Sequence, residues 1–296
     1  MTSPAPDAYG FVGLGNMGGP MAANLKAAGF DVIAYDAAGT ADRAPAGATI
    51  AQGPADVAAA ETVFFSLPDG PISAEVAAAI AVTPGRRATT VIDLSTIGPG
   101  HATDIAARLA EAGMAYMDAP VSGGTAGAKA GTVTVMFAGP ENVLARHRPA
   151  LDAMGRVFHV GTRPGQGQAM KLLNNFLSAT AMAATSEAVH FGLSQGLDLT
   201  TMIDVLNVST GRNSATDDKF PKRILTGTFD AGFTARLMTK DLALYRQAAT
   251  AAGGENRVLA TVDALWRELL AAWPDCDFTE VYRYVGGQGP VERDGG

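Results

Sequence analysis

The chain has 296 residues, of which 47% are hydrophobic and 17% charged, and its formal net charge is −7. This length is typical of about two domains, and the hydrophobic share excludes a chain that is disordered throughout. Binding to the phosphates of a nucleic acid requires clustered Lys and Arg. Because the chain is acidic and has no basic run, we expect no nucleic-acid partner.

The sequence also indicates in which cellular compartment the protein is expected. The sole cysteine, Cys276, can form no disulfide within the chain, which fits a reducing cytoplasm. The opening residues, MTSPAPDAYG, lack a basic region followed by an apolar stretch, so no signal peptide is expected. Gly, Asp or Pro interrupts each apolar run before it reaches the length of a membrane span. We therefore expect a cytoplasmic protein without a membrane partner.

The first half of the chain alternates short apolar runs with amphipathic or Ala-rich segments. The apolar runs predict strands over 9–13, 32–35, 63–67, 91–94 and 116–118. Between them, helices are predicted over segments such as 17–28 and 72–81. This alternation favours a parallel sheet that is covered by helices.

Two later runs change this pattern. Residues 132–139, TVTVMFAG, predict a strand that follows a Gly-rich loop too closely for a helical crossover, so we expect antiparallel pairing there. Residues 156–161, RVFHVG, predict the closing strand. The first domain is therefore expected over 7–164, with an α/β architecture and a mixed sheet.

Beyond RPGQG at 163–167, the chain is predicted to be helical. A long helix is expected over 168–195, where apolar or small residues recur at spacings of three and four. Such a helix would run about 40 Å, long enough to cross between two domains. Further helices are predicted over 200–208, 236–252 and 257–272. We expect an all-α second domain over 165–290, joined to the first by the long helix.

Residues 10–18, GFVGLGNMG, contain Gly13-x-Gly15-x-x-Gly18 between a predicted strand and a predicted helix. In a dinucleotide-binding turn the first Gly permits the tight turn and the second lets the pyrophosphate approach the backbone. The third Gly allows close contact between helix and strand, and the helix start offers free N–H groups to phosphate. The position of the motif favours this interpretation over a purely structural Gly-rich turn.

Asp36 ends the second predicted strand, at the distance expected of a ribose-binding carboxylate. A carboxylate accepts hydrogen bonds from the ribose hydroxyls and repels a 2′-phosphate, so Asp36 favours NAD over NADP. Arg43 lies several residues farther along and is the opposing signal, because a guanidinium favours the phosphate.

Residues that would serve other chemistries do not cluster in the sequence. No metal site is expected, because metal-ligand spacing is absent from the four histidines, which are His101, His147, His159 and His190. His159 lies in an apolar run, where packing or a backbone hydrogen bond is expected. Cys276 stands between two aspartates and is expected to be inert.

Four segments together resemble the β-hydroxyacid dehydrogenase family, and in particular its 3-hydroxyisobutyrate dehydrogenases. They are GFVGLGNMGGPMAANL (10–25), DAPVSGGTAGAKAGT (118–132), GQGQAMKLLNN (165–175) and LMTKDL (237–242), in the family's order and spacing. The resemblance covers nearly the whole chain. It implies a Rossmann domain followed by a helical domain, and an NAD-dependent oxidoreductase of a small anionic 3-hydroxy acid. It also implies a homodimer or homotetramer.

The resemblance further implies roles for individual residues. Lys171 matches the family's catalytic residue. The matching substrate contacts are Ser122, Gly123, Gly124, Asn175 and Lys240. The matching cofactor contacts are Gly13, Leu14, Gly15, Asn16, Met17, Asp36, Leu67, Pro68, Thr96 and again Lys240.

Elementary chemistry agrees with these roles. Lys171 and Asn175 are four residues apart in a predicted helix and therefore share a face. A lysine amine can take a hydroxyl proton during alcohol oxidation, but free lysine has too high a pKa for efficient base action. Desolvation or neighbouring positive charge must therefore lower that pKa. The helix pattern alone leaves a solvated surface lysine equally open.

The other motifs also have plainer interpretations. The SGG sequence at 122–124 leaves backbone N–H groups open to a carboxylate, but it is equally typical of a sharp turn before a strand. Lys240 and Asp241 are also compatible with a surface ion pair on a helix.

Residues 209–222, STGRNSATDDKFPK, depart from the family, whose 3-hydroxyisobutyrate enzymes commonly carry a longer, aromatic-containing segment there. Arg212 is a candidate for a second anion contact or for a helix cap, and Phe233 for the pocket wall or the core. The departure bears on the substrate rather than on the reaction.

Two further functions stay open on the sequence. One is NADPH-dependent reduction of glyoxylate or of a small semialdehyde such as tartronate or succinic semialdehyde, and Asp36 argues against its cofactor. The other is a non-catalytic nucleotide-binding module, against which the joint presence of Lys171, Asn175 and Lys240 argues. Imine reductases share the Gly-rich turn but usually lack a lysine at position 171, and 6-phosphogluconate dehydrogenases are longer.

Overall fold

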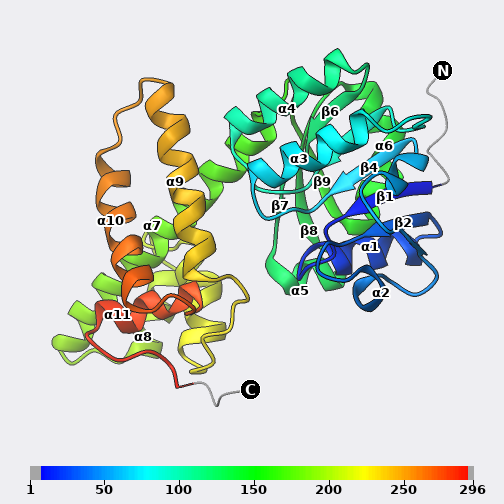
Figure 1. The fold of residues 1–296 in the computed structure, drawn as a ribbon. Helices are drawn as coiled ribbons and strands as arrows, with labels where there is room; N and C mark the ends of the chain where they lie inside the picture. Colours follow the sequence, from blue (N-terminus) through cyan, green and yellow to red (C-terminus); the bar gives the residue numbers. More distant parts are fainter. Residues whose placement is uncertain (1–7, 293–296) are drawn as a thin grey trace. The chain divides into compact units, whose positions relative to one another are not determined.

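Strands and helices alternate through the first part of the chain, as the periodicity predicts. The computed structural model describes residues 8–292 (Figure 1). The strands are β1 (Ala8–Val12), β2 (Asp31–Tyr35), β3 (Thr49–Ile50), β4 (Thr62–Phe65), β5 (Thr90–Asp93), β6 (Ala115–Asp118), β7 (Val121–Ser122), β8 (Val133–Ala138) and β9 (Gly155–Gly161). Each predicted strand agrees with one of these within two or three residues at either end, whereas the two-residue strands β3 and β7 are too short for the periodicity to indicate.

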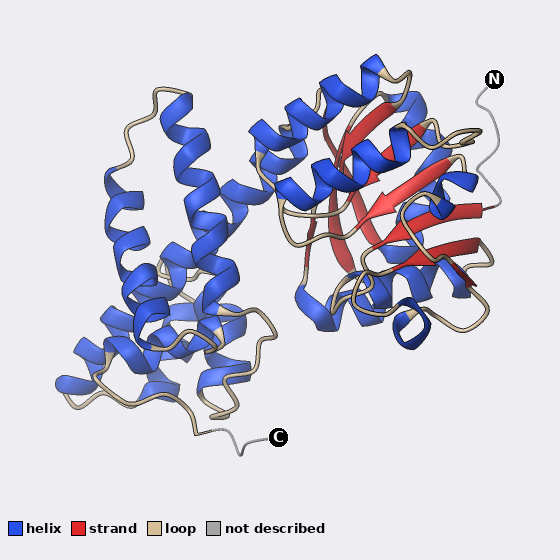
Figure 2. Ribbon diagram, in the orientation of Figure 1, coloured by secondary structure: helices blue, strands red, loops and turns tan. Residues whose placement is uncertain are grey.

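The nine strands of the described residues form one mixed sheet (Figure 2). Six of them follow the order β3–β2–β1–β4–β5–β6 with parallel pairing throughout, which is the strand order of a doubly wound dinucleotide-binding sheet. The sheet continues into β8, which is antiparallel to both β6 and β7 and parallel to β9. The expected antiparallel pairing is confirmed, and with it the mixed α/β sheet.

Helices cover both faces of this sheet (Figure 2). They are α1 (Gly18–Ala27), α2 (Thr40–Arg43), α3 (Gly70–Ala81), α4 (Pro99–Glu111), α5 (Gly124–Ala130) and α6 (Glu141–Met154), with a short 3₁₀ turn, η1 (Asp56–Ala59). Apolar residues of α1, α5 and α6 pack with Phe64, whereas those of α3 and α4 pack with its neighbours Val63 and Phe65. Successive residues of a strand face opposite sides, so a strand buried on both faces has an unbroken apolar sequence.

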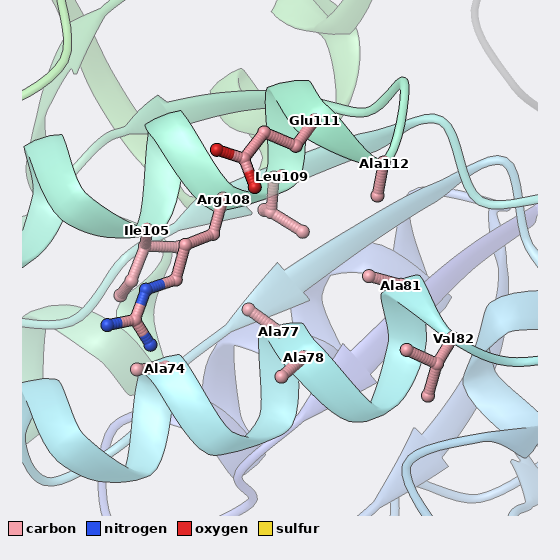
Figure 3. Close-up of a pocket in the computed structure, with 10 residues that line it drawn as sticks. All are labelled: Ala74, Ala77, Ala78, Ala81, Val82, Ile105, Arg108, Leu109, Glu111 and Ala112. Carbon is pink, nitrogen blue, oxygen red and sulfur yellow. The ribbon is translucent and has the colours of Figure 1, made fainter.

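An apolar groove of about 320 Å³ lies between α3 and α4 (Figure 3). Half of the residues that line it are alanines, and Arg108 and Glu111 are its charged residues. The residues that line it include none of those predicted to bind cofactor or substrate.

The chain divides into two compact units, Met1–Lys171 and Leu172–Gly296. The division falls inside α7 (Gln166–Ser194), a continuous helix of 29 residues. The rest of the second unit is helical and consists of α8 (Leu199–Asn207), η2 (Ala215–Ile224), α9 (Ala235–Ala251), α10 (Arg257–Ala272), η3 (Phe278–Glu280) and α11 (Val281–Val285). The predicted all-α second part is confirmed.

The core of the second unit gathers around Trp266, which is fully buried. Side-chain caps help to explain why its helices begin where the sequence predicts. Asp198 accepts a hydrogen bond from the Thr201 N–H at the start of α8, and Thr234 accepts one from the Leu237 N–H at the start of α9. Such a cap satisfies a backbone donor that has no partner within the helix.

The segment that departs from the family forms a π-helical turn, η2. Its aromatic residue Phe220 is fully buried, with its ring 5.6 Å from that of Tyr282 in an edge-to-face contact. This part of the departing segment therefore belongs to the core of the second unit.

No helix within residues 8–292 is both long and apolar enough to cross a membrane. The predicted start of the first domain at residue 7 lies outside the described residues, as does most of the MTSPAPDAYG segment.

Candidate functional site

The Gly13–Gly18 turn connects β1 to α1 by close contacts between backbone atoms. Gly13 has a φ of 92°, and its N–H donates to the Tyr35 carbonyl at 2.9 Å. A Cβ on Gly13 would lie 2.2 Å from the Ser66 carbonyl oxygen, and one on Gly18 would lie 1.9 Å from the Gly13 carbonyl oxygen. The fold itself therefore requires the first and third glycines of the motif.

Gly15 differs from both of them. It is exposed, and a Cβ built on it would meet no atom within 4 Å. Packing in the chain alone therefore gives no reason for glycine at this position. A pyrophosphate that approaches the backbone does give one, because a side chain would occupy its place. The turn fits a dinucleotide.

Asp36, directly after β2, is held against this turn. Its Oδ2 accepts a hydrogen bond from the Leu14 N–H at 2.6 Å, and its Oδ1 accepts one from the Ala38 N–H at 2.8 Å. The Asp36 N–H donates to the Thr40 hydroxyl at 3.0 Å. These contacts fix the carboxylate close to the glycine turn, and the sequence motif gave no sign of the part that Thr40 plays.

Arg43 also reaches this carboxylate, with its Nη1 3.6 Å from the Asp36 Oδ1. The guanidinium is about half exposed. An ion pair exposed to this degree is worth at most about 1 kcal/mol. Arg43 therefore lies nearer to the predicted ribose-binding residue, Asp36, than its place in the sequence suggests.

Two predicted cofactor positions lie in loops that are joined by a hydrogen bond. The Leu67 N–H, just after β4, donates to the Ser95 hydroxyl at 2.8 Å, and Ser95 directly precedes Thr96. Pro68 follows Leu67 and is exposed. Because β4 and β5 pair in parallel, both loops leave the sheet at the same edge.

The Ser122–Gly124 segment links β7 to α5 through two unusual backbone conformations. Gly123 has a φ of 137° and Gly124 a φ of 64°, which L residues with side chains rarely adopt. Nearby, the Asn24 side-chain amide in α1 donates to the Ala128 carbonyl at 2.8 Å, so α1 and α5 are tied together. The segment therefore forms a sharp turn, but this turn leads into helix α5 and not directly into the next strand.

A buried polar network that the sequence did not indicate lies at the start of α7. The carboxylate of Asp118, at the end of β6, accepts hydrogen bonds from the Gly165 and Gln168 N–H groups, both at 2.8 Å. The Gln168 side chain accepts from the Ile97 and Gly98 N–H groups and donates to the Ser95 carbonyl. The only available signal was that Asp118 and Gln168 lie inside two of the resemblance motifs.

Asp118 is fully buried, and so is Asp93 on the adjacent strand β5. Burial raises the pKa of Asp118 from 3.8 to about 6, although hydrogen bonds from Gln168 and Gly165 oppose the shift. Burial likewise raises the pKa of Asp93, against hydrogen bonds from Ser95 and Tyr116. Both carboxyl groups therefore favour their protonated forms more than free aspartates do.

Lys171 lies in the second turn of α7 with only 7% of its surface exposed, which excludes the fully solvated surface lysine. In the second unit, the Asn175 side-chain amide donates to the Asp241 Oδ2 at 2.6 Å. The Lys240 amine lies 3.5 Å from the Asp241 Oδ1. Asp241 is buried, so this is no ordinary surface ion pair.

The remaining candidates have structural partners. Arg212 forms an exposed ion pair with Asp217 at 2.9 Å. Phe233 is partly buried and packs against the core of the second unit, edge-to-face on Phe278 at 5.9 Å between the rings. His159 donates from Nε2 to the Gly139 carbonyl at 2.8 Å, and this backbone hydrogen bond confirms the expectation.

Cys276 is buried, as an inert thiol would be. Among residues 8–292, no three His, Cys, Asp or Glu side chains form a group that could hold a metal ion.

Two family models match the chain and together cover both units. One, described as the NAD-binding domain of 6-phosphogluconate dehydrogenase, matches residues 8–161. The other, described as NAD-binding of NADP-dependent 3-hydroxyisobutyrate dehydrogenase, matches residues 165–285.

Similar proteins match along most of their length. The chain is 38% identical to 2-(hydroxymethyl)glutarate dehydrogenase of Eubacterium barkeri, over 86% of this chain and 85% of that protein. It is 37% identical to NAD-dependent L-serine dehydrogenase of Pseudomonas aeruginosa, over 92% and 96%. A solved structure of Mycobacterium tuberculosis 3-hydroxyisobutyrate dehydrogenase with L-serine superposes with a TM-score of 0.86 at 33% identity, covering 95% of this chain and 99% of that one.

A first prediction separates two glycines of the turn, one by its effect on stability and the other by its effect on NADH binding. Gly18→Ala forces a Cβ against the Gly13 carbonyl oxygen, so the free energy of unfolding should fall by about 1–3 kcal/mol. Gly15→Ala meets no atom of the chain, so stability should be kept while the dissociation constant for NADH rises at least tenfold. Urea denaturation and NADH fluorescence titration measure the two effects. Unchanged NADH affinity in Gly15→Ala would contradict the assignment of the turn.

A second prediction concerns the pH dependence of stability. Because the pKa of Asp118 is raised in the folded state to about 6 from 3.8, its protonated form favours folding. That contribution is complete below the unfolded pKa and is lost as pH rises through the folded one. Between pH 7 and pH 5, the free energy of unfolding of the wild type should rise by about 1 kcal/mol relative to Asp118→Asn. Urea denaturation of both proteins at each pH tests this, and a pH-independent difference would contradict it.

Proposed function

This chain is a member of the β-hydroxyacid dehydrogenase family, and from that premise we propose that it oxidises a short acid of the form HOCH₂–CHR–COO⁻ to the corresponding semialdehyde, with NAD as hydride acceptor. The observation that carries the proposal is a feature shared by the names of the matched proteins. 2-(Hydroxymethyl)glutarate, L-serine and 3-hydroxyisobutyrate each bear a hydroxymethyl group on the carbon that carries a carboxylate. The group R differs in all three, so we leave R open for this chain.

NAD is proposed rather than NADP because of Asp36. Its carboxylate lies against the glycine turn, where it can accept from ribose hydroxyls and would repel a 2′-phosphate. Arg43 is the opposing feature, but it already lies 3.6 Å from that same carboxylate. The nicotinamide of the bound cofactor would supply the hydride acceptor, and the open face at Gly15 fits its pyrophosphate.

For the substrate, we assign the carboxylate to Ser122, Gly123 and Gly124. The positive φ angles of the two glycines expose backbone N–H groups without side chains in front of them, and Ser122 adds a hydroxyl donor. Asn175 and Lys240 are proposed as further substrate contacts, with Lys240 also near the cofactor. Their shared neighbour Asp241 orients the Asn175 amide through a hydrogen bond of 2.6 Å.

Lys171 is proposed as the general acid–base. In the oxidation direction, its neutral amine accepts the hydroxyl proton as the carbon–hydrogen bond of the hydroxymethyl group breaks. In the reduction direction, its ammonium returns that proton to the carbonyl oxygen. Burial of the amine within α7 removes the competing water that surrounds an exposed lysine.

We also propose that copies of the chain associate into a homodimer or homotetramer. Along α7, Leu177 and Phe191 are 59% and 68% exposed, so this helix presents large apolar side chains to water. A second copy that packs along this helix would remove them from water.

A panel of short hydroxy acids with NAD and with NADP tests substrate and cofactor together. It should include 3-hydroxyisobutyrate, 3-hydroxypropionate, serine, glycerate and 4-hydroxybutyrate, with reduced nicotinamide followed by absorbance. We expect the HOCH₂–CHR–COO⁻ acids to be oxidised with NAD and 4-hydroxybutyrate to be a poor substrate. No turnover with any of them would favour the nucleotide-binding module instead.

The same assay tests Asp36. Asp36→Asn keeps an oxygen for the Leu14 N–H but removes the negative charge, so repulsion of a 2′-phosphate is relieved. The ratio of kcat/KM for NADP to that for NAD should therefore rise at least tenfold. A wild type that already prefers NADP by about tenfold, or about 1.4 kcal/mol, would show that the role given to Asp36 is wrong.

Lys171→Met tests the acid–base assignment. The substitution keeps much of the side-chain volume but removes the amine, so folding and NADH binding should survive. Because general acid–base groups contribute about a hundred- to ten-thousand-fold, kcat should fall at least a hundredfold. In the wild type, kcat for oxidation should rise with pH, because the amine must be neutral to accept a proton.

The matched control is Lys26→Met. Lys26 lies in the last turn of α1, where it pairs with Asp31, and its loss should leave kcat unchanged. A Lys171→Met enzyme that retains more than about a tenth of wild-type kcat, in a step limited by chemistry, would remove the lysine from the mechanism.

A further inference from the structure

We propose that Gln168 is a positioning residue, which holds the first turns of α7, and with them Lys171, against the 95–98 loop that carries Thr96. The proposal rests on the proposed function in one respect, the role of Lys171 as acid–base. Gln168 itself is assigned no contact with substrate or cofactor. It acts through the backbone groups that it joins.

The Gln168 side chain is fully buried and uses both ends of its amide. Its Oε1 accepts hydrogen bonds from the Ile97 N–H at 2.9 Å and the Gly98 N–H at 3.0 Å. Its Nε2 donates to the Ser95 carbonyl at 2.9 Å. One side chain thus binds backbone groups of Ser95, Ile97 and Gly98, in a loop that lies about seventy residues away in sequence.

The backbone of Gln168 is fixed as well. Its N–H donates to the Asp118 Oδ2 at 2.8 Å, while the Gly165 N–H donates to the other oxygen of that carboxylate. Asp118 thus serves the helix start as an N-cap residue does, although it belongs to strand β6. The first turn of α7 is therefore attached to the ends of β5 and β6 through side-chain and backbone bonds together.

These bonds bear on chemistry because of their position in the helix. Lys171 is three residues beyond Gln168, so the two are separated by less than one helical turn. The 95–98 loop is tied in turn to the loop after β4, since the Ser95 hydroxyl accepts from the Leu67 N–H. Gln168 thus joins the turn that leads to Lys171 to both loops that hold predicted cofactor residues.

Loss of the Gln168 hydrogen bonds would displace catalytic groups and not only lower stability. A shift of about 1 Å in a reacting group can cost a hundredfold in rate. Removal of the Gln168 amide would leave the Ile97 and Gly98 N–H groups buried without their acceptor, and the loop would have to move to satisfy them. The 95–98 loop and the start of α7 would then no longer be held against each other.

Gln166, in the same turn, provides a matched control. Its Oε1 also accepts two backbone N–H bonds, from Thr162 and Arg163, both at 2.9 Å. Those donors directly precede the helix in sequence, so Gln166 closes a local turn and does not reach the 95–98 loop. Gln166→Met and Gln168→Met therefore remove the same functional group from neighbouring sites with different partners.

The experiment compares these two variants with the wild type. For Gln168→Met, we expect kcat to fall at least tenfold, KM for the hydroxy acid to change less than threefold, and the midpoint of the pH dependence of kcat to move by at least half a unit. Amide hydrogen exchange at 97–98 should accelerate. Gln166→Met should keep kcat within twofold and leave both the pH midpoint and exchange at 97–98 unchanged.

Several outcomes would overturn the proposal. Wild-type kcat and pH dependence in Gln168→Met would do so, as would equal kinetic losses in both variants. A lowered melting temperature with unchanged kinetics would show a purely structural role. If Gln168→Met does not fold, Gln168→Glu serves instead at low pH, because its protonated carboxyl group keeps an acceptor for the Ile97 and Gly98 N–H groups and a hydroxyl donor for the Ser95 carbonyl. It should show a smaller fall in kcat, and unchanged kinetics would again count against the proposal.

Lys171→Met separates this inference from the proposed function. If Lys171→Met is inactive and Gln168→Met is fully active, the positioning role is wrong and the acid–base assignment stands. If Lys171→Met is fully active, the assignment itself is wrong, whatever Gln168→Met does.

Discussion

Parallel pairing of β1, β4, β5 and β6 is the constraint on which the candidate site depends. The register places Val12 beside Phe65, Phe65 beside Asp93, and Asp93 beside Asp118, so the four strands end in one row. Segments that are more than a hundred residues apart in the chain therefore leave the sheet at a common edge. The glycine turn, the two loops with predicted cofactor residues and the start of α7 follow directly on that row, where ligands of open α/β sheets bind.

That edge of the sheet contains buried carboxyl groups, although most of the surrounding core is apolar. Asp93 and Asp118 are fully buried, and burial raises the pKa of each. The fold tolerates two buried carboxyl groups because backbone N–H groups donate to them, including those of Ser95 and Gln168. A buried polar network of this kind defines one arrangement of the loops, whereas an apolar contact would allow several.

Sequence periodicity and motifs predicted the fold class because their signals are local. Three of the four residues of β4 form an apolar run, and α10 has the bounds, 257–272, that its apolar spacing predicts. The glycine turn is equally local. The partners of Gln168 could not be predicted, because they depend on strand order and register. The approach of Arg43 to Asp36 depends on the fold of the intervening turn, and the core position of Phe233 depends on a partner forty-five residues away.

The bond between Asp36 and the Leu14 N–H has a consequence for how nucleotide preference evolves. The carboxylate that we propose to bind the ribose also ties the glycine turn to the end of β2, through a hydrogen bond of 2.6 Å. A mutation that replaces Asp36 with a larger or basic side chain changes the group proposed to recognise the ribose. The same mutation removes the acceptor of the Leu14 N–H, so the glycine turn loses its hydrogen bond to the end of β2. A lineage that changes coenzyme through such a side chain therefore needs a compensating donor–acceptor pair elsewhere in the turn, whereas a change to asparagine, which keeps an oxygen for the Leu14 N–H, does not.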